Sequence, residues 1–265
     1  MNAATGSALE LVELTIAFGA REVVHLDRFE IGRGEIVGLA GESGSGKSMT
    51  ALAILGLAPL AGARVGGEVR FEGRNLLELS QRELRDVRGR RIAMIFQSPV
   101  ASFNPVVRVG DLFARALVLH GASTRRDARD RAREALSAVL LSSDLLQRYP
   151  HQLSGGQAQR VAIALALALR SEILLADEPT SALDVTVQAE ILDLIRDLRD
   201  RRGMSVLFIS HDLAVVSELC DRVAVMRRGR IVEAGVVRDV LGDPADDYTR
   251  DLVAAVPRIG PTEGA

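Results

Sequence analysis

A glycine-rich segment with one lysine offers the most specific chemistry in the sequence. Residues 41–48 read GESGSGKS, match the spacing G-x-x-x-x-G-K-[ST], and lie between a strand-like run and a helix-like run. The three glycines let the backbone curl so that its N–H groups point at an anion, and the positive end of the following helix faces the same place. Lys47 is the only lysine in a chain with 33 Lys and Arg residues. Its compact ammonium suits β- and γ-phosphates, and the Ser48 hydroxyl suits Mg²⁺.

This segment predicts a phosphate-binding loop. The alternatives are a glycine-rich surface turn, which does not account for the matching flanks, and a dinucleotide fold, whose spacing G-x-G-x-x-G is absent. The residues that we expect to bind the phosphate-bearing ligand are Gly41, Glu42, Ser43, Gly44, Ser45, Gly46, Lys47, Ser48 and Met49.

Two acids follow the apolar run 173–176, which reads as a buried strand. Ligands of α/β proteins bind at the carboxyl ends of strands, so both carboxylates are expected at one sheet edge. Asp177 suits a Mg²⁺ partner, and Glu178 suits a general base that polarises an attacking water. The alternative for each acid is a structural role at the start of the helix that follows Pro179.

A second anion-binding turn precedes the strongest helical pattern in the chain. Residues 153–157 read LSGGQ, and a Ser-Gly-Gly turn at a helix N-terminus directs N–H groups at an anion. The turn has no lysine of its own, so we expect it to close over a γ-phosphate that another subunit holds. The alternative is an ordinary helix cap, since serine is a routine N-cap residue.

The composition places these motifs in a globular chain. Of 265 residues, 48% are apolar and 26% are charged, so the chain can bury a core. The net charge of −2 argues against a general nucleic-acid binder, and we expect no nucleic-acid partner. A single cysteine, Cys220, excludes an intramolecular disulfide and suits a reducing interior. The longest uncharged stretch, 48–63, is too short for a membrane span, and residues 1–10 lack a secretory leader, so we expect a cytosolic chain.

Strand patterns alternate with helical patterns along most of the chain, which predicts an α/β core with a parallel sheet. We expect an all-helical insertion at 98–160, core segments at 1–97 and 161–241, and a C-terminal tail at 242–265. Strands are expected at 9–18, 35–40, 68–71, 91–96, 173–176 and 205–209, with a terminal hairpin at 223–226 and 231–233. Helices are expected at 49–57, from 109 to about 141, and at 156–170.

The motifs occur in the order that is typical of ABC transporter ATPase subunits, and the chain resembles that family over about residues 9–256. The resemblance rests on GESGSGKS, Gln97 after RIAMIF, LSGGQ, ILLADE, SALD, and His211 after VLFIS. It implies a P-loop nucleotide-binding core with a mixed sheet and a helical subdomain, which hydrolyses ATP with Mg²⁺. It also implies that two subunits hold two ATP molecules head to tail between them.

The resemblance assigns roles to further residues. Gln97 would contact Mg²⁺ and the attacking water, and His211 would contact the γ-phosphate and hold Glu178. Asp184 would communicate between the two sites. Phe18 matches the aromatic that stacks on adenine, and an ordinary strand residue is the alternative there. The residues that would close each site from the second subunit are Ser154, Gly155, Gly156 and Gln157. The implied Mg²⁺ ligands are Ser48, Gln97 and Asp177.

Three stretches are similar to importers of peptides, nickel and related solutes: FQSPVASFNP at 96–105, DVTVQAEILDLI at 184–195, and the ending GRIVEAGVVRDVLGDPADDYTRDLVAAVP at 229–257. The similarity implies transmembrane permease subunits, a second ATPase subunit in a homodimer or heterodimer, and an extracytoplasmic solute-binding protein. It also implies a peripheral place on the cytoplasmic face of the cell membrane. The chain lacks the cysteine-containing extension of many peptide-importer ATPases, which leaves peptide, nickel and metallophore cargo open.

Two other function classes remain as alternatives. A soluble ABC ATPase of DNA repair or translation usually needs a long coiled coil or a second ATPase domain, and the sequence contains neither. A nucleotide-binding module that does not hydrolyse ATP is disfavoured by the presence of both Glu178 and His211.

Overall fold

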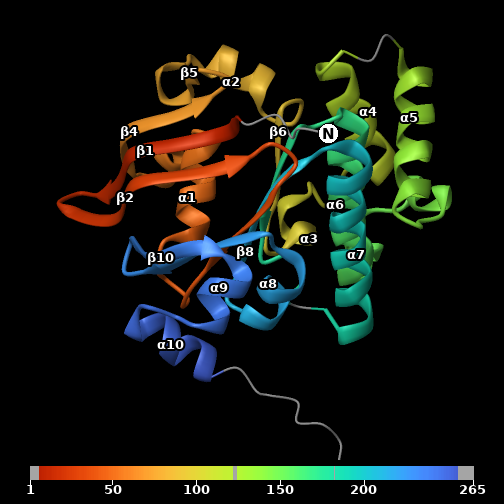
Figure 1. Ribbon diagram of the computed structural model, residues 1–265. Helices are drawn as coiled ribbons and strands as arrows, with labels where there is room; N and C mark the ends of the chain where they lie inside the picture. Colours follow the sequence, from red (N-terminus) through yellow and green to blue (C-terminus); the bar gives the residue numbers. More distant parts are fainter. Residues whose placement is uncertain (1–5, 122–123, 182, 256–265) are drawn as a thin grey trace, which may run out of the picture.

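Two β-sheets form the framework of the chain, and helices cover them (Figure 1). The structure is a computed structural model that describes residues 6–121, 124–181 and 183–255. The first sheet is antiparallel with the order β2-β1-β4-β5, and the second has six strands in the order β10-β9-β3-β8-β7-β6. The first sheet contains β1 (Ser7–Phe18), β2 (Arg21–Gly32), β4 (Arg64–Phe71) and β5 (Arg74–Asn75). The second contains β3 (Ile36–Ala40), β6 (Ile92–Ile95), β7 (Ile173–Asp177), β8 (Ser205–Ser210), β9 (Arg222–Arg227) and β10 (Arg230–Val236).

The six-stranded sheet is parallel except for β10, which pairs antiparallel with β9. All residues of β3, β7 and β8 are buried, because both faces of the sheet are covered. On β3, Val37 and Leu39 join a core with the first sheet, whereas Ile36 and Ala40 join a core with the helices on the other face. The predicted mixed α/β fold is confirmed.

Helix α1 (Lys47–Ile54) lies between the two sheets. Its buried Ala51, Ala53 and Ile54 belong to the core that both sheets share, and the helix contacts β1 and β7. The small alanines let the helix approach two sheets at once, and this packing fixes the direction of its N-terminus. The phosphate-binding segment immediately precedes that N-terminus, so the core positions the loop.

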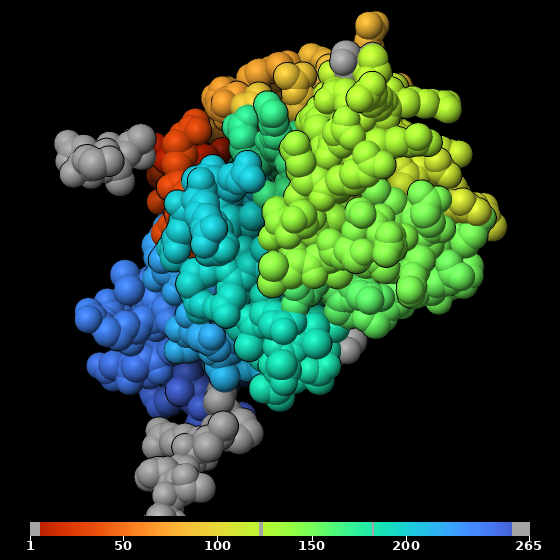
Figure 2. All heavy atoms as spheres, turned by 90° about the vertical axis from the view of Figure 1, so that its right-hand side faces the viewer, coloured from red at the N-terminus to blue at the C-terminus, as the bar shows by residue number. Residues whose placement is uncertain are grey.

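A run of helices separates β6 from β7 and gathers on one side of the molecule, as Figure 2 shows for residues of about 100–150. The helical pattern from 109 to about 141 corresponds to two helices in the structure, and Gly121 takes a left-handed conformation (φ 103°) after the first. Phe113 is fully buried and ties this part to the core. The helices are α3 (Pro99–Ser102), α4 (Val109–Leu119), α5 (Arg125–Ala138) and α6 (Gly155–Leu169). The boundary that we placed between 160 and 161 falls inside α6.

The remaining helices connect or cover the strands. They are α2 (Gln81–Val87), α7 (Val185–Arg202), α8 (Leu213–Leu219), α9 (Val237–Gly242) and α10 (Asp247–Ala254), and short 3₁₀ segments lie at 58–61, 76–78, 143–147 and 150–152. Among the described residues no helix is long and apolar enough to span a bilayer.

The structure differs from the sequence predictions at two further places. Strand β2 was missed, because its exposed positions carry several charged side chains that interrupt the apolar pattern of REVVHLDRFEIG. The tail expected at 242–265 is wrong for its first part, since residues 247–254 form α10 and Tyr248 is buried. The last residues, 256–265, lie outside the described part of the chain.

Candidate functional site

The carboxyl ends of three adjacent strands bring the predicted phosphate-binding and acidic residues to one sheet edge. In the parallel register Ala40 of β3 pairs with Ser210 of β8, and Ile209 pairs with Asp177 of β7. Gly41, His211 and Glu178 each follow one of these residues in the sequence. The sheet therefore assembles the site from segments that are far apart along the chain, as open α/β sheets do at their ligand-binding edge.

The phosphate-binding segment turns tightly against the rest of the core. Gly41, Gly44 and Gly46 have φ values of 144°, 81° and 110°, which side-chain-bearing residues rarely adopt. A Cβ atom on Gly41 would lie 2.1 Å from the carbonyl oxygen of Met226 in β9, so this position also has no space for one. The three glycines predicted from spacing thus suit the conformation of the turn, and packing against β9 adds a second requirement at Gly41.

Lys47 lies inside the loop and is only 5% exposed. Its Nζ donates hydrogen bonds to the carbonyl oxygens of Gly41 (2.6 Å) and Glu42 (2.9 Å). Burial lowers the pKa of the Lys47 ammonium below its ordinary value, while the negative charges of Glu178, Asp177 and Glu42 act in the opposite direction. A desolvated cation next to so many acceptors is suited to a strongly negative ligand.

Ser48 and Asp177 form a pair of oxygen donors at the start of α1. The Ser48 Oγ donates to Asp177 Oδ1 at 2.9 Å. Burial raises the pKa of the Asp177 carboxyl, and the hydrogen bond from Ser48 lowers it in part. A hydroxyl and a carboxylate at this separation are ligands that Mg²⁺ prefers, so the donor chemistry fits the predicted metal position.

Glu178 is held beside His211 at the end of β7. Its side chain is almost buried, and His211 Nδ1 lies 2.6 Å from Oε2 and 2.8 Å from Oε1. The Glu178 backbone has a left-handed conformation (φ 50°), and its N–H donates to the carbonyl of Ile209 at 2.9 Å. Non-glycine residues in this conformation are uncommon and concentrate at functional sites. The backbone therefore turns the carboxylate out of the strand and into the site.

Ser45 shows that the loop has unused hydrogen-bonding capacity. Its side chain is 4% exposed, and its Oγ has no hydrogen-bond partner among the described residues. A buried hydroxyl without a partner is unfavourable unless a ligand satisfies it. Together with Lys47, this hydroxyl fits a phosphate group at the loop.

The LSGGQ segment lies at the N-terminus of α6. Ser154 is the N-cap: its Oγ accepts from the N–H of Gln157 at 3.2 Å, and Gln157 Oε1 accepts from the N–H of Ser154 at 3.1 Å. Ser154 therefore caps the helix, which is the structural alternative that the sequence offered for it. Ser154, Gly155 and the Gln157 side chain remain at least partly accessible, and no hydrogen bond joins this segment to 41–48 among the described residues. The structure of one chain does not bring it to the phosphate loop.

The remaining predicted residues are Gln97, Asp184, Phe18 and Met49. Gln97 is exposed two residues after β6, and it makes no hydrogen bond within the described part of the chain. Asp184 caps α7 by accepting from the N–H of Val187 at 3.0 Å. Phe18 ends β1 and is 36% exposed, and Met49 is half-buried in α1.

One contact to the phosphate loop was missed from the sequence. The hydroxyl of Tyr248 in α10 accepts a hydrogen bond from the N–H of Glu42 at 3.1 Å. The two residues are 206 positions apart, and no motif spacing links them.

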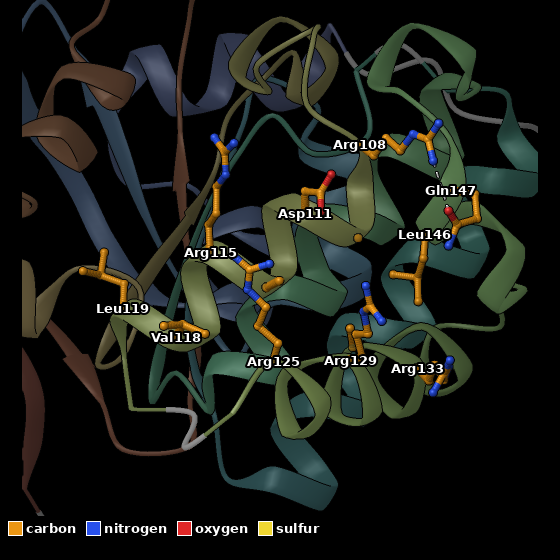
Figure 3. A pocket seen from close by; sticks show the side chains of 13 residues that line it. Arg108, Asp111, Arg115, Val118, Leu119, Arg125, Arg129, Arg133, Leu146 and Gln147 are labelled. Carbon is orange, nitrogen blue, oxygen red and sulfur yellow. Dashed lines mark hydrogen bonds between the residues drawn. The ribbon is translucent and has the colours of Figure 1, made fainter.

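A cavity of about 730 Å³ lies elsewhere, between α4, α5 and residues 146–147 (Figure 3). None of the predicted site residues lines it, so it is distinct from the phosphate loop. Five arginines line this cavity: Arg108, Arg115, Arg125, Arg129 and Arg133.

Comparisons with known proteins show the family of the chain. Residues 24–181 match the family described as ABC transporter. A Sinorhizobium fredii protein named "Probable peptide ABC transporter ATP-binding protein" is 54% identical over 86% of this chain and 69% of its own length. The glutathione import ATP-binding protein of Escherichia coli O157:H7 is 45% identical over 98% of this chain, which spans 44% of that protein.

A solved structure gives the same result for the fold. The dimeric post-hydrolysis state of an ATP-binding cassette bound to ADP and phosphate has a TM-score of 0.75 at 31% identity, over 87% of this chain and 99% of that one. The family predicted from the ordered motifs is confirmed. Neither relative is named for DNA repair or translation. The chain therefore belongs to the ABC transporter family and is one of its ATP-hydrolysing cassettes.

Proposed function

We propose that the chain powers the import of peptides or related small solutes through separate transmembrane permeases. The names of the two relatives, for peptide transport and glutathione import, support this cargo class. The nickel and metallophore cargo that the sequence left open is not favoured by either name. The permeases supply the pore, and an extracytoplasmic binding protein supplies the solute. The cassette itself works at the cytoplasmic face of the membrane.

One contact carries the hydrolytic part of the proposal: the pairing of Glu178 with His211 beside the phosphate loop. His211 Nδ1 lies within hydrogen-bond distance of both carboxylate oxygens, so the imidazole orients the Glu178 carboxylate. Glu178 then takes a proton from the attacking water as a general base. A module that only binds nucleotide has no use for a buried carboxylate held in this way.

The phosphate loop binds the β- and γ-phosphates of ATP through Lys47, its backbone N–H groups and the Ser45 hydroxyl. Ser48 and Asp177 hold Mg²⁺, with Gln97 as its third protein partner. When bound, Mg²⁺ neutralises charge on the phosphates. Phe18 lies against the adenine. These residues position ATP so that its γ-phosphate faces Glu178.

Each reaction site is completed by a second cassette, in a homodimer or a heterodimer. The accessible LSGGQ turn supports this arrangement, because its N–H groups at the start of α6 suit an anion that its own chain does not deliver. Asp184, at the start of α7, communicates between the two sites. ATP then joins the two cassettes, and loss of the γ-phosphate lets them part.

Different segments of the chain have different roles in this proposal. Residues 1–97 and 161–241 bind and hydrolyse the nucleotide, and the helical segment 98–160 passes closure to the permease through Gln97. The long helix α6 crosses the boundary at 160 and gives this transmission a rigid element.

Reconstitution tests the proposal. The cassette is purified together with its permeases and reconstituted in proteoliposomes. Phosphate release is then measured with and without a peptide-loaded binding protein. We expect peptide to raise hydrolysis and to accumulate inside the vesicles. Hydrolysis by a chain that never co-purifies with a membrane protein would contradict the transport role.

A further inference from the structure

Helix α10 reaches the phosphate loop through one buried side chain. Tyr248 is 5% exposed, and its hydroxyl accepts the N–H of Glu42 at 3.1 Å. Glu42 is the second residue of the loop, so this contact fixes the loop at its entry rather than along α1. Tyr248 lies within the ending 229–257 that resembles the importer group, but the sequence assigned it no role in the nucleotide site.

The peptide group between Gly41 and Glu42 is also hydrogen-bonded at its carbonyl end. The N–H of Glu42 and the carbonyl of Gly41 belong to one planar unit, and that carbonyl accepts a hydrogen bond from Lys47 Nζ at 2.6 Å. A chain of contacts therefore runs from the Tyr248 hydroxyl through one rigid peptide to the Lys47 ammonium. Rotation of this peptide would break both hydrogen bonds at once.

Gly41 is the residue at which such a rotation would otherwise be easy. Its backbone is in a conformation (φ 144°) that glycine adopts more readily than other residues. The flexibility that the turn requires thus leaves the orientation of the next peptide weakly determined. The Tyr248 hydroxyl adds a constraint from outside the loop to the one that Lys47 supplies from within it.

Tyr248 is itself firmly placed. The Arg227 guanidinium stacks on its ring, 4.6 Å from the centroid. Asp246 caps α10 by accepting from the N–H of Tyr248 at 2.9 Å. Glu233 of β10 accepts from the N–H groups of Ala245 (2.9 Å) and Asp246 (3.2 Å), which fastens the entry to the helix. The helix end that carries the tyrosine is therefore held by β9 and β10.

We infer that Tyr248 is a positioning residue for ATP binding, which sets the Gly41–Glu42 peptide and through it the Lys47 ammonium. The inference rests on the assignment of Lys47 to the phosphates of ATP. The Tyr248 hydroxyl contacts the backbone of the loop at Glu42, so we expect it to act on affinity and to leave the proton transfer to Glu178. Helix α10 is then a functional part of the nucleotide site.

The test compares Tyr248→Phe with Tyr149→Phe, which removes the other tyrosine hydroxyl of the described residues. Phenylalanine keeps the ring under Arg227 and deletes only the acceptor. The dissociation constant for Mg-ATP is measured on the full chain, and hydrogen exchange is followed at the Glu42 amide. The Thr50 amide, which donates to the carbonyl of Gly46 within the loop and helix, is the internal reference.

For Tyr248→Phe we expect ATP affinity to fall about 3- to 10-fold, as for the loss of one hydrogen bond, with kcat within about twofold of the parent. The Glu42 amide should exchange faster while Thr50 is unchanged. Tyr149→Phe should leave both readouts at their parent values. The inference is overturned when folded Tyr248→Phe binds ATP within twofold of the parent, or when kcat falls and affinity does not.

The test of Tyr248 is independent of the test of peptide transport. ATP affinity and amide exchange are measured on the cassette without permeases, so a failure of peptide import leaves them unaffected. If Tyr248→Phe does not change ATP affinity, the proposed ATP hydrolysis and peptide cargo still stand. A variant that fails to bind ATP through general unfolding is identified by faster exchange at Thr50 as well.

Discussion

Nδ1 of His211 lies 2.6 Å from Oε2 of Glu178, although the two residues are 33 positions apart. The parallel pairing of β7 and β8 brings them together, since each follows the carboxyl end of its strand. A nearly buried carboxylate beside an exposed imidazole suits the general base that we propose, because the contact fixes its orientation. This contact gives the first prediction.

Glu178→Gln should abolish turnover while ATP still binds. The amide keeps the size of the side chain but has no basic oxygen pair to accept the water proton, so phosphate release should fall by about 10²-fold or more. Native-rate hydrolysis by the variant would remove Glu178 as the base. Glu218→Gln, an exposed substitution in α8, serves as the control and should hydrolyse ATP at the parent rate.

Gly41→Ala should prevent ATP binding because its Cβ would meet the Met226 carbonyl oxygen at 2.1 Å. Gly62→Ala is the matched control: Gly62 also has a positive φ (84°), but nothing lies within 4 Å of a Cβ there. Both variants carry conformational strain, and only the first displaces the phosphate loop from β9. Equal ATP dissociation constants for the two variants would contradict the role assigned to this packing.

The affinity for ATP should weaken at alkaline pH earlier than an ordinary lysine would allow. Burial lowers the pKa of Lys47. As pH rises through this lowered pKa, the ammonium of the free chain loses its positive charge. The electrostatic attraction between Lys47 and phosphate is then lost. Titration of ATP binding from about pH 7 to pH 10 measures the effect, below the ordinary lysine value of about 10.4. Lys47→Arg keeps its charge and should show a flat profile. A parent profile as flat as that of the arginine variant would refute the prediction.

Ser154→Arg should bind ATP normally and fail to hydrolyse it, because the bulky cation blocks the turn that closes the partner's site. Loss of the N-cap costs about 1 kcal/mol of stability, so a control with the same loss is needed. Ser142→Arg provides it, since Ser142 caps the 3₁₀ segment 143–147 and lies outside the predicted site. Hydrolysis at the parent rate by Ser154→Arg would exclude the turn from the reaction.

Much of this arrangement was predictable because its signals are local. The glycines and Lys47 are adjacent in sequence, and the apolar run before Asp177 identifies a buried strand by itself. Parallel pairing then places Glu178 near the loop without further information. The confirmed fold follows from the same alternation of strands and helices.

The parts that escaped prediction depend on contacts between distant segments. Strand β2 has a charged exposed side that obscures its period, and it is stabilised by pairing with β1 and by burying its apolar side in the core that the two sheets share. Tyr248 lies in a segment whose helix is short and charged, so its role depends on burial against a loop 206 residues away. The proposed relation of Ser154 to the phosphates was predicted from the LSGGQ turn, and it needs a pair of chains, so the structure of one chain does not test it.

Mixing two inactive variants tests the shared site most directly. Lys47→Ala disables the phosphate loop of a chain, and Ser154→Arg disables the turn that it lends to a partner. A mixed pair still contains one intact site, formed by Lys47 of one chain and Ser154 of the other, so ATP hydrolysis should return when the two purified variants are combined. A mixture that forms pairs and remains as inactive as its components would contradict the account.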